Sequence, residues 1–381
     1  MKIAVPNESQ GGERRVALVP DVIKRLSGKG HEVVVESGAG EGARIPDALF
    51  EEAGAKIGSP EGADVVVRVT PPSADDVERL PNGSVLIGFL APLTSPETTR
   101  ALASAGVTAF AMEAIPRISR AQSMDALSSQ ASVGGYRATL IAAQELGRFF
   151  PMLTTAAGTI PPAKVLVLGA GVAGLQAIAT AKRLGAQVTA FDVRSVVKEQ
   201  VQSLGAKFLE LDIGADAEAE GGYARELTPE EQEAQQKALN EAIGDFDVVI
   251  TTALIPGRPA PKLVTEAGVH NMKPGSVIVD LAGEAGGNCE LTKPGETILE
   301  DDVVIASPLN LPSTMPEHAS QLYSRNIMSL LDLITGEEGE LNLNFEDEVV
   351  AGACVTREGD IVHEGAKKAA GAQAETQQGA S

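Results

Sequence analysis

Tryptophan is absent from this 381-residue sequence, aromatic residues make up 3% of it, and cysteine occurs twice. Cys289 and Cys354 are too few for a disulfide framework, and no CxxC or Cys/His cluster has the spacing of metal ligands. Nucleic-acid stacking platforms use more aromatic side chains than this chain offers. We therefore expect no metal, no disulfide scaffold and no nucleic-acid partner.

Long apolar runs are also absent. No window approaches the about 18 uninterrupted apolar residues of a membrane-spanning helix, and the N-terminal sequence MKIAVPNESQ lacks the apolar core of a signal peptide. These absences predict a cytoplasmic protein, which could still dock on a membrane protein.

Positive charge is scarce, with 31 lysines and arginines against 52 aspartates and glutamates, a formal net charge of −21 and a pI near 4.6. Such a surface repels phosphate backbones and anionic membranes, which is a second argument against nucleic acid. Two interpretations of the acidity stay open. It keeps a solvated surface soluble, or it recognises a basic patch on a partner protein.

Short apolar runs and helical patterns alternate along the chain, as they do in proteins with parallel α/β sheets. The fold class we predict is α/β, with two Rossmann-like, doubly wound parallel-sheet domains and a cleft between them. The first domain comprises residues 1–127 and is completed by the returning segment 313–381. Residues 128–312 form the second domain. A chain of 381 residues is too long for one ordinary core.

Five segments are assigned by their local pattern. Residues 124–150 have a helical period and lead out of the first domain, and residues 311–334 form an amphipathic helix. The acidic stretch 212–239 begins as a loop and ends as a helix. Residues 343–364 have the pattern of a strand pair with a turn at EGD, and the polar tail 367–381 is expected to fray.

The strongest local motif is KVLVLGAGVAGLQAIATAKRLGAQVTAFDVR. Gly169, Gly171 and Gly174 form G-x-G-x-x-G between a predicted strand and a predicted helix, and Asp192 ends the next strand. In dinucleotide-binding folds these glycines allow a tight turn, close approach of the pyrophosphate and close packing of the helix. Asp192 favours NAD over NADP, because a carboxylate repels a 2′-phosphate. Arg194 is the contrary signal, since an arginine can bind a phosphate.

Only four histidines are present, namely His31, His270, His318 and His363, and none of them lies beside a motif. Structural or exposed roles suit all four better than catalysis. Oxidation of a hydroxyl or an amine by NAD also removes a proton, which normally requires a histidine or lysine near the nicotinamide. Direct hydride exchange between two nicotinamides requires only positioning and exclusion of water.

At this point the sequence resembles the alanine dehydrogenase and transhydrogenase superfamily, and within it the NAD(H)-binding component, the first domain of the alpha subunit, of proton-translocating transhydrogenases. The resemblance covers nearly the whole chain before the tail. It is carried by KIAVPNE, GERRVALVP, PRISRAQSMDALSSQ, TTAAGTIPPA with the glycine motif, GGYARE, TTALIPGRPAP, MKPGSVIVDLAGEAGGNCE and GACVTREGDIVH.

The resemblance assigns a role to PRISRAQSMDALSSQ. It implies that Arg117, Gln122, Asp125 and Ser128 are the catalytic group, which surrounds the NAD(H) nicotinamide and orients its carboxamide without transferring a proton. The alternative is a capped helix start, with Ser123 or Asp125 as the N-cap. The full set of predicted cofactor-binding residues is Arg117, Ile118, Ser119, Gln122, Ser123, Met124, Asp125, Gly169, Ala170, Gly171, Val172, Gly174, Asp192, Val193, Arg194, Gly222, Tyr223, Gln235 and Leu254.

Within that set, Gly222 and Tyr223 are similar to a mobile loop that closes over the nucleotide in this family. The glycines give hinge freedom and the tyrosine offers an aromatic face to the adenosine end. An ordinary surface loop is the alternative. Gln235 and Leu254 are placed beside the nucleotide by the resemblance alone.

Membership of the family implies a homodimer that docks the NADP(H)-binding domain of the transhydrogenase beta subunit, with hydride passing from NADH to NADP⁺. The implied cofactors are NAD(H) on this chain and NADP(H) on the partner, with no metal. Proton translocation would depend on separate membrane-spanning subunits, so the chain is expected in the cytoplasm, peripherally associated with the inner membrane.

Two other functions stay open. The first is a free-standing alanine or amino-acid dehydrogenase, which shares the fold. That family has a lysine after the strand ADVVVRV and a catalytic histidine in SVLIGFL, where this chain has Arg68 and Phe89. Arg15 falls where the dehydrogenase holds its substrate carboxylate, and it is alternatively a structural arginine. The second function is a non-catalytic NAD-sensing module.

Overall fold

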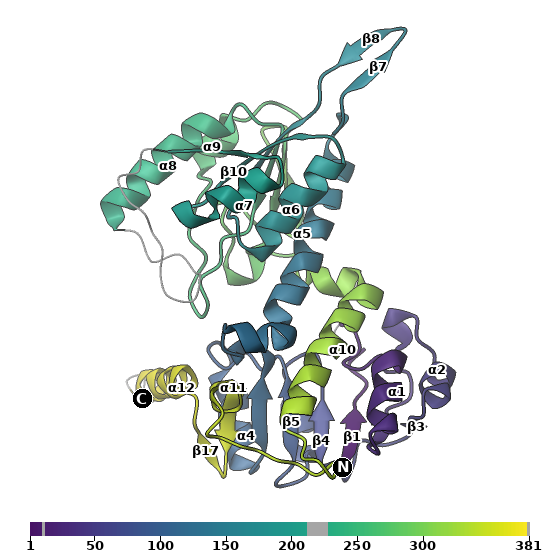
Figure 1. Cartoon of the computed structure of the whole chain (residues 1–381). Helices are drawn as coiled ribbons and strands as arrows, with labels where there is room; N and C mark the ends of the chain where they lie inside the picture. Colours follow the sequence, from purple (N-terminus) through teal and green to yellow (C-terminus); the bar gives the residue numbers. More distant parts are fainter. Residues whose placement is uncertain (10–11, 212–227, 379–381) are drawn as a thin grey trace. The chain divides into compact units, whose positions relative to one another are not determined.

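The computed structural model describes residues 1–9, 12–211 and 228–378. The chain divides into two compact units. Unit 1 consists of Met1–Gln130 with Pro312–Ser381, and unit 2 of Ala131–Leu311 (Figure 1). In the described residues no helix is both long and apolar enough to cross a membrane.

Unit 1 contains an eight-stranded sheet in the order β17-β16-β6-β5-β4-β1-β2-β3. The first six strands along the chain pair in parallel, and β16 and β17 add an antiparallel edge. The strands are β1 (Lys2–Val5), β2 (Glu32–Val35), β3 (Lys56–Ile57), β4 (Val65–Val67), β5 (Val85–Gly88), β6 (Thr108–Ala111), β16 (Cys354–Arg357) and β17 (Asp360–Ile361).

Helices pack on this sheet (Figure 1) because its central strands are apolar on both faces. Val65 and Val67 lie in one hydrophobic core and Val66 in the other, as the alternation of side chains along a strand requires. The α-helices are α1 (Pro20–Gly28), α2 (Asp47–Glu52), α3 (Ala74–Arg79), α4 (Pro96–Ser104), α10 (Pro316–Leu333), α11 (Glu348–Ala353) and α12 (Glu364–Gln378).

The returning segment supplies a large part of the core of unit 1. Tyr323, Ile327, Leu330 and Leu331 recur at intervals of three and four residues along α10, and all are fully buried against the sheet. Unit 1 therefore depends on residues that follow the whole of unit 2 in the sequence.

Unit 2 contains a seven-stranded sheet in the order β11-β10-β9-β12-β13-β15-β14. All neighbours pair in parallel except β14 with β15. The order reverses between β9 and β12, which is the switch point where doubly wound sheets bind their ligands. The strands are β9 (Lys164–Leu168), β10 (Gln187–Phe191), β11 (Lys207–Phe208), β12 (Val248–Thr251), β13 (Val277–Asp280), β14 (Thr297–Glu300) and β15 (Val303–Ala306).

Helices lie on this second sheet too. One of them, α5, carries the chain from the first segment of unit 1 into unit 2. The others begin and end within unit 2. Their bounds are α5 (Ala126–Glu145), α6 (Val172–Arg183), α7 (Lys198–Ser203), α8 (Pro229–Ile243) and α9 (Glu266–His270).

A separate two-stranded hairpin, β7 (Leu153–Thr155) and β8 (Gly158–Ile160), projects from unit 2 in Figure 1. The sequence suggests only a turn-rich connection here. The hairpin forms because Leu153 to Thr155 pair with Gly158 to Ile160 across a two-residue turn that Gly158 leaves at φ 125°.

Two expectations for the C-terminal segment are wrong. Residues 348–353, predicted as part of a strand pair, form α11, because the Asp347 carboxylate accepts hydrogen bonds from the Val349 and Val350 amides and caps the helix. The tail predicted to fray forms α12, where the Ala370 carbonyl accepts a hydrogen bond from Arg100 and Ala366 is buried.

Candidate functional site

The glycine turn follows β9 and opens α6, as the motif predicts. Gly169 has φ +98°, and a Cβ atom there would lie 2.5 Å from the Thr252 Oγ1 atom. A Cβ on Gly174 would lie 1.9 Å from the Gly169 carbonyl oxygen, so the helix can start this close to the strand only at a glycine. A Cβ on Gly171 would meet no atom within 4 Å, so backbone there faces open space. This cradle fits a dinucleotide pyrophosphate at the N-terminus of α6.

Asp192 lies directly after β10 and is tied to the same turn. Its Oδ2 atom accepts a hydrogen bond from the Ala170 amide at 2.7 Å. Arg194 donates to both oxygens, from Nε to Oδ1 at 2.9 Å and from Nη2 to Oδ2 at 2.8 Å, and its own amide donates to Oδ1 at 2.9 Å. A carboxylate offers about four acceptor sites. All four of these are used, so a ribose hydroxyl has to displace Arg194 from Asp192.

Two polar side chains that the sequence analysis missed support the turn from below. The Thr252 hydroxyl donates to the carbonyl oxygen of Gly169 at 3.1 Å. Asn288 then holds the following residue, because its Oδ1 accepts from the Ala253 amide at 3.0 Å and its Nδ2 donates to the Ala253 carbonyl at 2.9 Å. Leu254, one of the predicted contacts, comes next and is 49% exposed.

Asp280 is a third residue that the sequence analysis missed. It ends β13 and is fully buried, where its carboxylate accepts hydrogen bonds from the Thr251 and Thr292 hydroxyls at 2.9 and 2.6 Å and from two backbone amides. The available signal was a carboxylate at the carboxyl end of a parallel strand. Asp280 thereby joins the ends of β12 and β13 to the loop that carries Asn288.

The segment PRISRAQSMD lies in unit 1 and contains the short helix η3 (Ser119–Met124), shortly before α5. Asp125 accepts two hydrogen bonds from Ser128, one from the amide at 2.8 Å and one from the hydroxyl at 2.6 Å. This is the arrangement of an N-cap, so the structural alternative for Asp125 is present. A capping role leaves the carboxylate half-buried at the end of the helix, where it can still contact a ligand.

The other predicted residues differ in accessibility. The side chains of Arg117, Ser119, Gln122 and Ser123 differ from that of Met124, which is buried in the core of unit 1, because all four have access to solvent. Among the predicted residues of unit 2, Val172 is exposed. Ile118 and Val193 are half-buried.

The remaining predicted contacts lie on or before α8. Gln235 is 4% exposed, and its Oε1 atom has no hydrogen-bond partner among the described residues. Gly222 and Tyr223 lie outside the described residues.

The residues that matter for a dehydrogenase are occupied by protein contacts. Arg15 donates from Nε and Nη2 to the two carboxylate oxygens of Glu13, at 2.9 and 2.8 Å, and from Nη1 to Gln130 at 2.9 Å. All three side chains are buried. A substrate carboxylate would have to replace Glu13 at Arg15.

Arg68 is likewise buried and paired. Its Nε atom donates to the Thr70 carbonyl at 2.6 Å and its Nη1 atom lies 3.1 Å from an Asp76 oxygen. Burial raises the pKa of the neighbouring Glu8, and Arg68 opposes that rise. Phe89 packs on the ring of Tyr323 at 5.2 Å between centroids. Neither position offers a group that transfers a proton at neutral pH.

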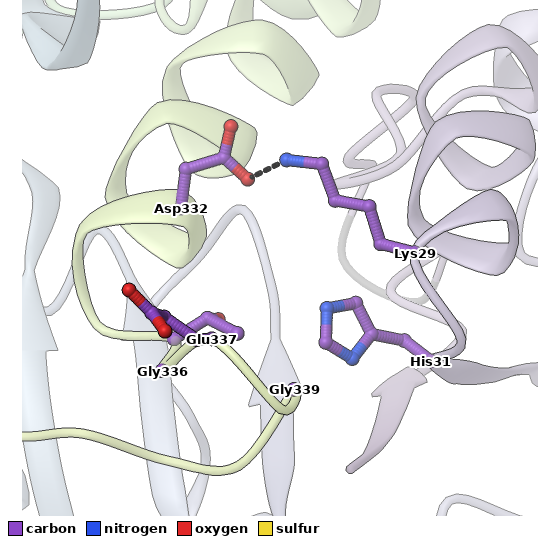
Figure 2. Close-up of a pocket in the computed structure, with 7 residues that line it drawn as sticks. Lys29, His31, Asp332, Gly336, Glu337 and Gly339 are labelled. Carbon is purple, nitrogen blue, oxygen red and sulfur yellow. Dashed lines mark hydrogen bonds and ion pairs between the residues drawn. The ribbon is translucent and has the colours of Figure 1, made fainter.

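A hollow of about 400 Å³ in unit 1 is lined by Lys29, His31 and Asp332, with the loop from Thr335 to Gly339 (Figure 2). Lys29 donates to Asp332 across it at 2.6 Å. His31 precedes β2, so the hollow adjoins the amino end of that strand, whereas ligands of doubly wound sheets bind at the carboxyl ends. We therefore assign no nucleotide to it. Within the described ranges no group of three or more His, Cys, Asp or Glu side chains could hold a metal ion.

Known proteins resemble this chain over nearly its whole length. The family described as alanine dehydrogenase/PNT, N-terminal domain, matches residues 4–134, and alanine dehydrogenase/PNT, C-terminal domain, matches residues 138–364. An NAD(P) transhydrogenase subunit alpha of Rhodospirillum rubrum is 51% identical over 95% of this chain and 98% of its own length.

Two further comparisons agree with this. The crystal structure of transhydrogenase from Sinorhizobium meliloti is 46% identical and superposes with a TM-score of 0.87, covering 95% of this chain and 100% of that one. Alanine dehydrogenase of Mycolicibacterium smegmatis is 30% identical over 97% of this chain and 96% of its own. The predicted relationship and the predicted α/β fold class are both confirmed. The chain belongs to the alanine dehydrogenase/PNT family, and it is more similar to the transhydrogenase alpha subunit than to the alanine dehydrogenase.

Proposed function

We propose that this chain is the NAD(H)-binding component of a proton-translocating transhydrogenase, and that it passes hydride from NADH to NADP⁺ bound on a partner subunit. One observation carries the proposal. The positions where the related dehydrogenase holds its proton-transfer groups contain a paired arginine, Arg68, and a packed phenyl ring, Phe89, while the glycine cradle is intact.

The chain's own residues divide the work. When bound, NADH supplies the hydride. Backbone amides at the start of α6 would hold the pyrophosphate over Gly171, and Asp192 would accept a ribose hydroxyl once Arg194 has moved. In unit 1, Asp125, Ser128, Arg117 and Gln122 would orient the carboxamide through hydrogen bonds, and none of them has to move a proton.

We also propose that two copies of this chain associate through the β7–β8 hairpin. An isolated two-stranded hairpin is marginally stable in water. This one pairs with no other strand of the described chain, and Met152 and Ile160 are 62% and 47% exposed on it, with Phe149 at 50% just before. A second copy that covers these side chains would stabilise it.

The proposed partners are the NADP(H)-binding domain of a beta subunit and separate membrane-spanning subunits, which would hold the chain at the membrane. The transhydrogenase relative supports this proposal, because its name designates one subunit of a larger enzyme. Proton movement would occur in those other subunits.

The test is stopped-flow hydride transfer from NADH to an NADP⁺ analogue, with and without the NADP(H)-binding domain of a transhydrogenase. We expect transfer only when that domain is present. The same preparation is assayed with alanine, and with pyruvate and ammonia. Activity in those assays would identify a dehydrogenase instead, and tight NADH binding without any transfer would identify a sensing module.

A further inference from the structure

The segment that contains Asp125 and Ser128 is held at three points by the returning C-terminal segment of the same unit. The first point is Pro116. A Cβ atom on Gly352 would lie 2.5 Å from the Pro116 Cγ atom, so helix α11 approaches the start of this segment closely only because a glycine stands there.

The second point is Arg120, in η3. Its Nη1 and Nη2 atoms donate to the two oxygens of Asp347 at 2.8 and 2.9 Å, and its Nε atom lies 3.4 Å from a Glu348 oxygen. A two-bond arginine–carboxylate pair fixes direction as well as distance. Asp347 is itself fixed, because it caps α11 through Val349 and Val350.

The third point is Asn326, on α10. Its Nδ2 atom donates to the Ser123 carbonyl at 2.8 Å, and its Oδ1 atom accepts from the Ser129 hydroxyl at 2.7 Å. Asn326 is 7% exposed. Its two contacts fall on either side of the stretch from Asp125 to Ser128, so one buried amide brackets the predicted catalytic group.

Stability alone does not explain these contacts. The Arg120 side chain is 45% exposed and that of Asp347 is 21% exposed. Ion pairs this exposed contribute little to folding, whereas a displacement of about 1 Å at a reacting centre can slow the reaction as much as a hundredfold.

We propose that Arg120, Asp347 and Asn326 are positioning residues that hold Asp125 and Ser128 in place for hydride transfer. The inference rests on the proposed function. It makes the returning C-terminal segment part of the catalytic apparatus, although no residue of that segment is among the predicted contacts of the nucleotide.

The experiment uses the full chain with the NADP(H)-binding partner domain and compares Arg120→Gln, Arg120→Lys and Asp347→Asn. Asparagine at 347 retains the helix cap and removes only the charged pair. Lysine at 120 retains the charge and loses the two-bond geometry. The matched control is Asp332→Asn, which removes the exposed pair of Asp332 with Lys29 seen in Figure 2, elsewhere in the same unit.

We expect hydride transfer to slow roughly tenfold in Arg120→Gln and Asp347→Asn, and less in Arg120→Lys. The NADH dissociation constant should change less than about threefold, and Tm by less than about 3 °C, because the pair is exposed. The Asp332→Asn control should match the unaltered chain in all three measurements.

A second measurement does not depend on activity. Amide hydrogen exchange of the peptide from 116 to 129, without nucleotide, should speed up in the Arg120 and Asp347 variants and not in the control. Unchanged exchange and transfer in those variants, in a chain that does transfer hydride, would overturn the positioning role. Faster exchange in a chain that never transfers hydride would instead overturn the proposed function, and the positioning role with it.

Discussion

At the scale of single residues, the carboxylate of Asp192 is shared between two tasks. It holds the glycine turn through Ala170, and it accepts three hydrogen bonds from Arg194. The motif predicted that Asp192 would meet a ribose, and it identified Arg194 as a contrary signal. The contact between the two residues shows that they act as one unit, which their two-residue spacing alone could not establish.

We expect Arg194→Ala to increase the preference for NADH over NADPH by roughly tenfold, about 1.4 kcal/mol. The change frees two acceptor sites on Asp192 for the ribose hydroxyl, and it removes a cation that could bind a 2′-phosphate. The measurement is the dissociation constant of each nucleotide by fluorescence titration. Arg183→Ala, at the other end of α6, is the control, and an unaltered ratio of the two constants in Arg194→Ala would show that the arginine serves structure alone.

Asp125→Asn should slow hydride transfer by at least about tenfold and weaken NADH binding far less. Asparagine can still accept the Ser128 amide as a helix cap, so the loop should keep its fold, but the negative charge beside the carboxamide is lost. Stopped-flow transfer and NADH titration measure the two effects. Equal losses in both would argue against a positioning role, and Asp21→Asn, an exposed acid in the first turn of α1, should change neither.

At the scale of elements, local patterns were sufficient wherever the partner was near in the sequence. The strands of both sheets and the turn at Gly169 follow from apolar runs and glycine spacing. Helix α11 did not, because Val349 and Val350 favour a strand, and the cap from Asp347 decided the outcome. Arg120 was passed over for a similar reason, since its partner lies 227 residues away.

The β7–β8 hairpin carries its own prediction. Met152→Asp should shift the protein from dimer to monomer, because a buried unpaired carboxylate would destabilise the proposed contact. Sedimentation velocity over a range of concentrations measures the change. Leu299→Asp, which places the same charge on an edge strand at 65% exposure, should leave the mass as it is. A dimeric Met152→Asp chain would require another interface.

At the scale of the whole molecule, stability should depend on pH through buried histidine. Burial is the main cause that lowers the pKa of His31, helped by the N-terminal ammonium and Lys29 and opposed by Asp332 (Figure 2). A histidine with a lowered pKa binds its proton more readily in the unfolded chain. Its contribution to stability is therefore complete above about pH 6.5 and is lost as pH falls through the lower, folded value.

His31→Gln should flatten the dependence of the urea midpoint on pH between about pH 5 and pH 7. The exposed His318, changed to Gln, is the control. Two buried acids run the other way, since burial raises the pKa of Glu8 and Glu113, and they remain in both variants. A slope that His31→Gln does not change would mean that other groups cause the loss of stability in acid.

The order of the segments in unit 1 has a consequence for how the protein is made. Unit 2 is one continuous stretch, Ala131–Leu311, whereas unit 1 needs α10 and β16 from the last stretch of the chain. On a ribosome, unit 2 can fold while the first segment, Met1–Gln130, still waits for its partners. The nascent chain would then carry an exposed apolar sheet for most of translation, and Arg120 would meet Asp347 only in its final seconds.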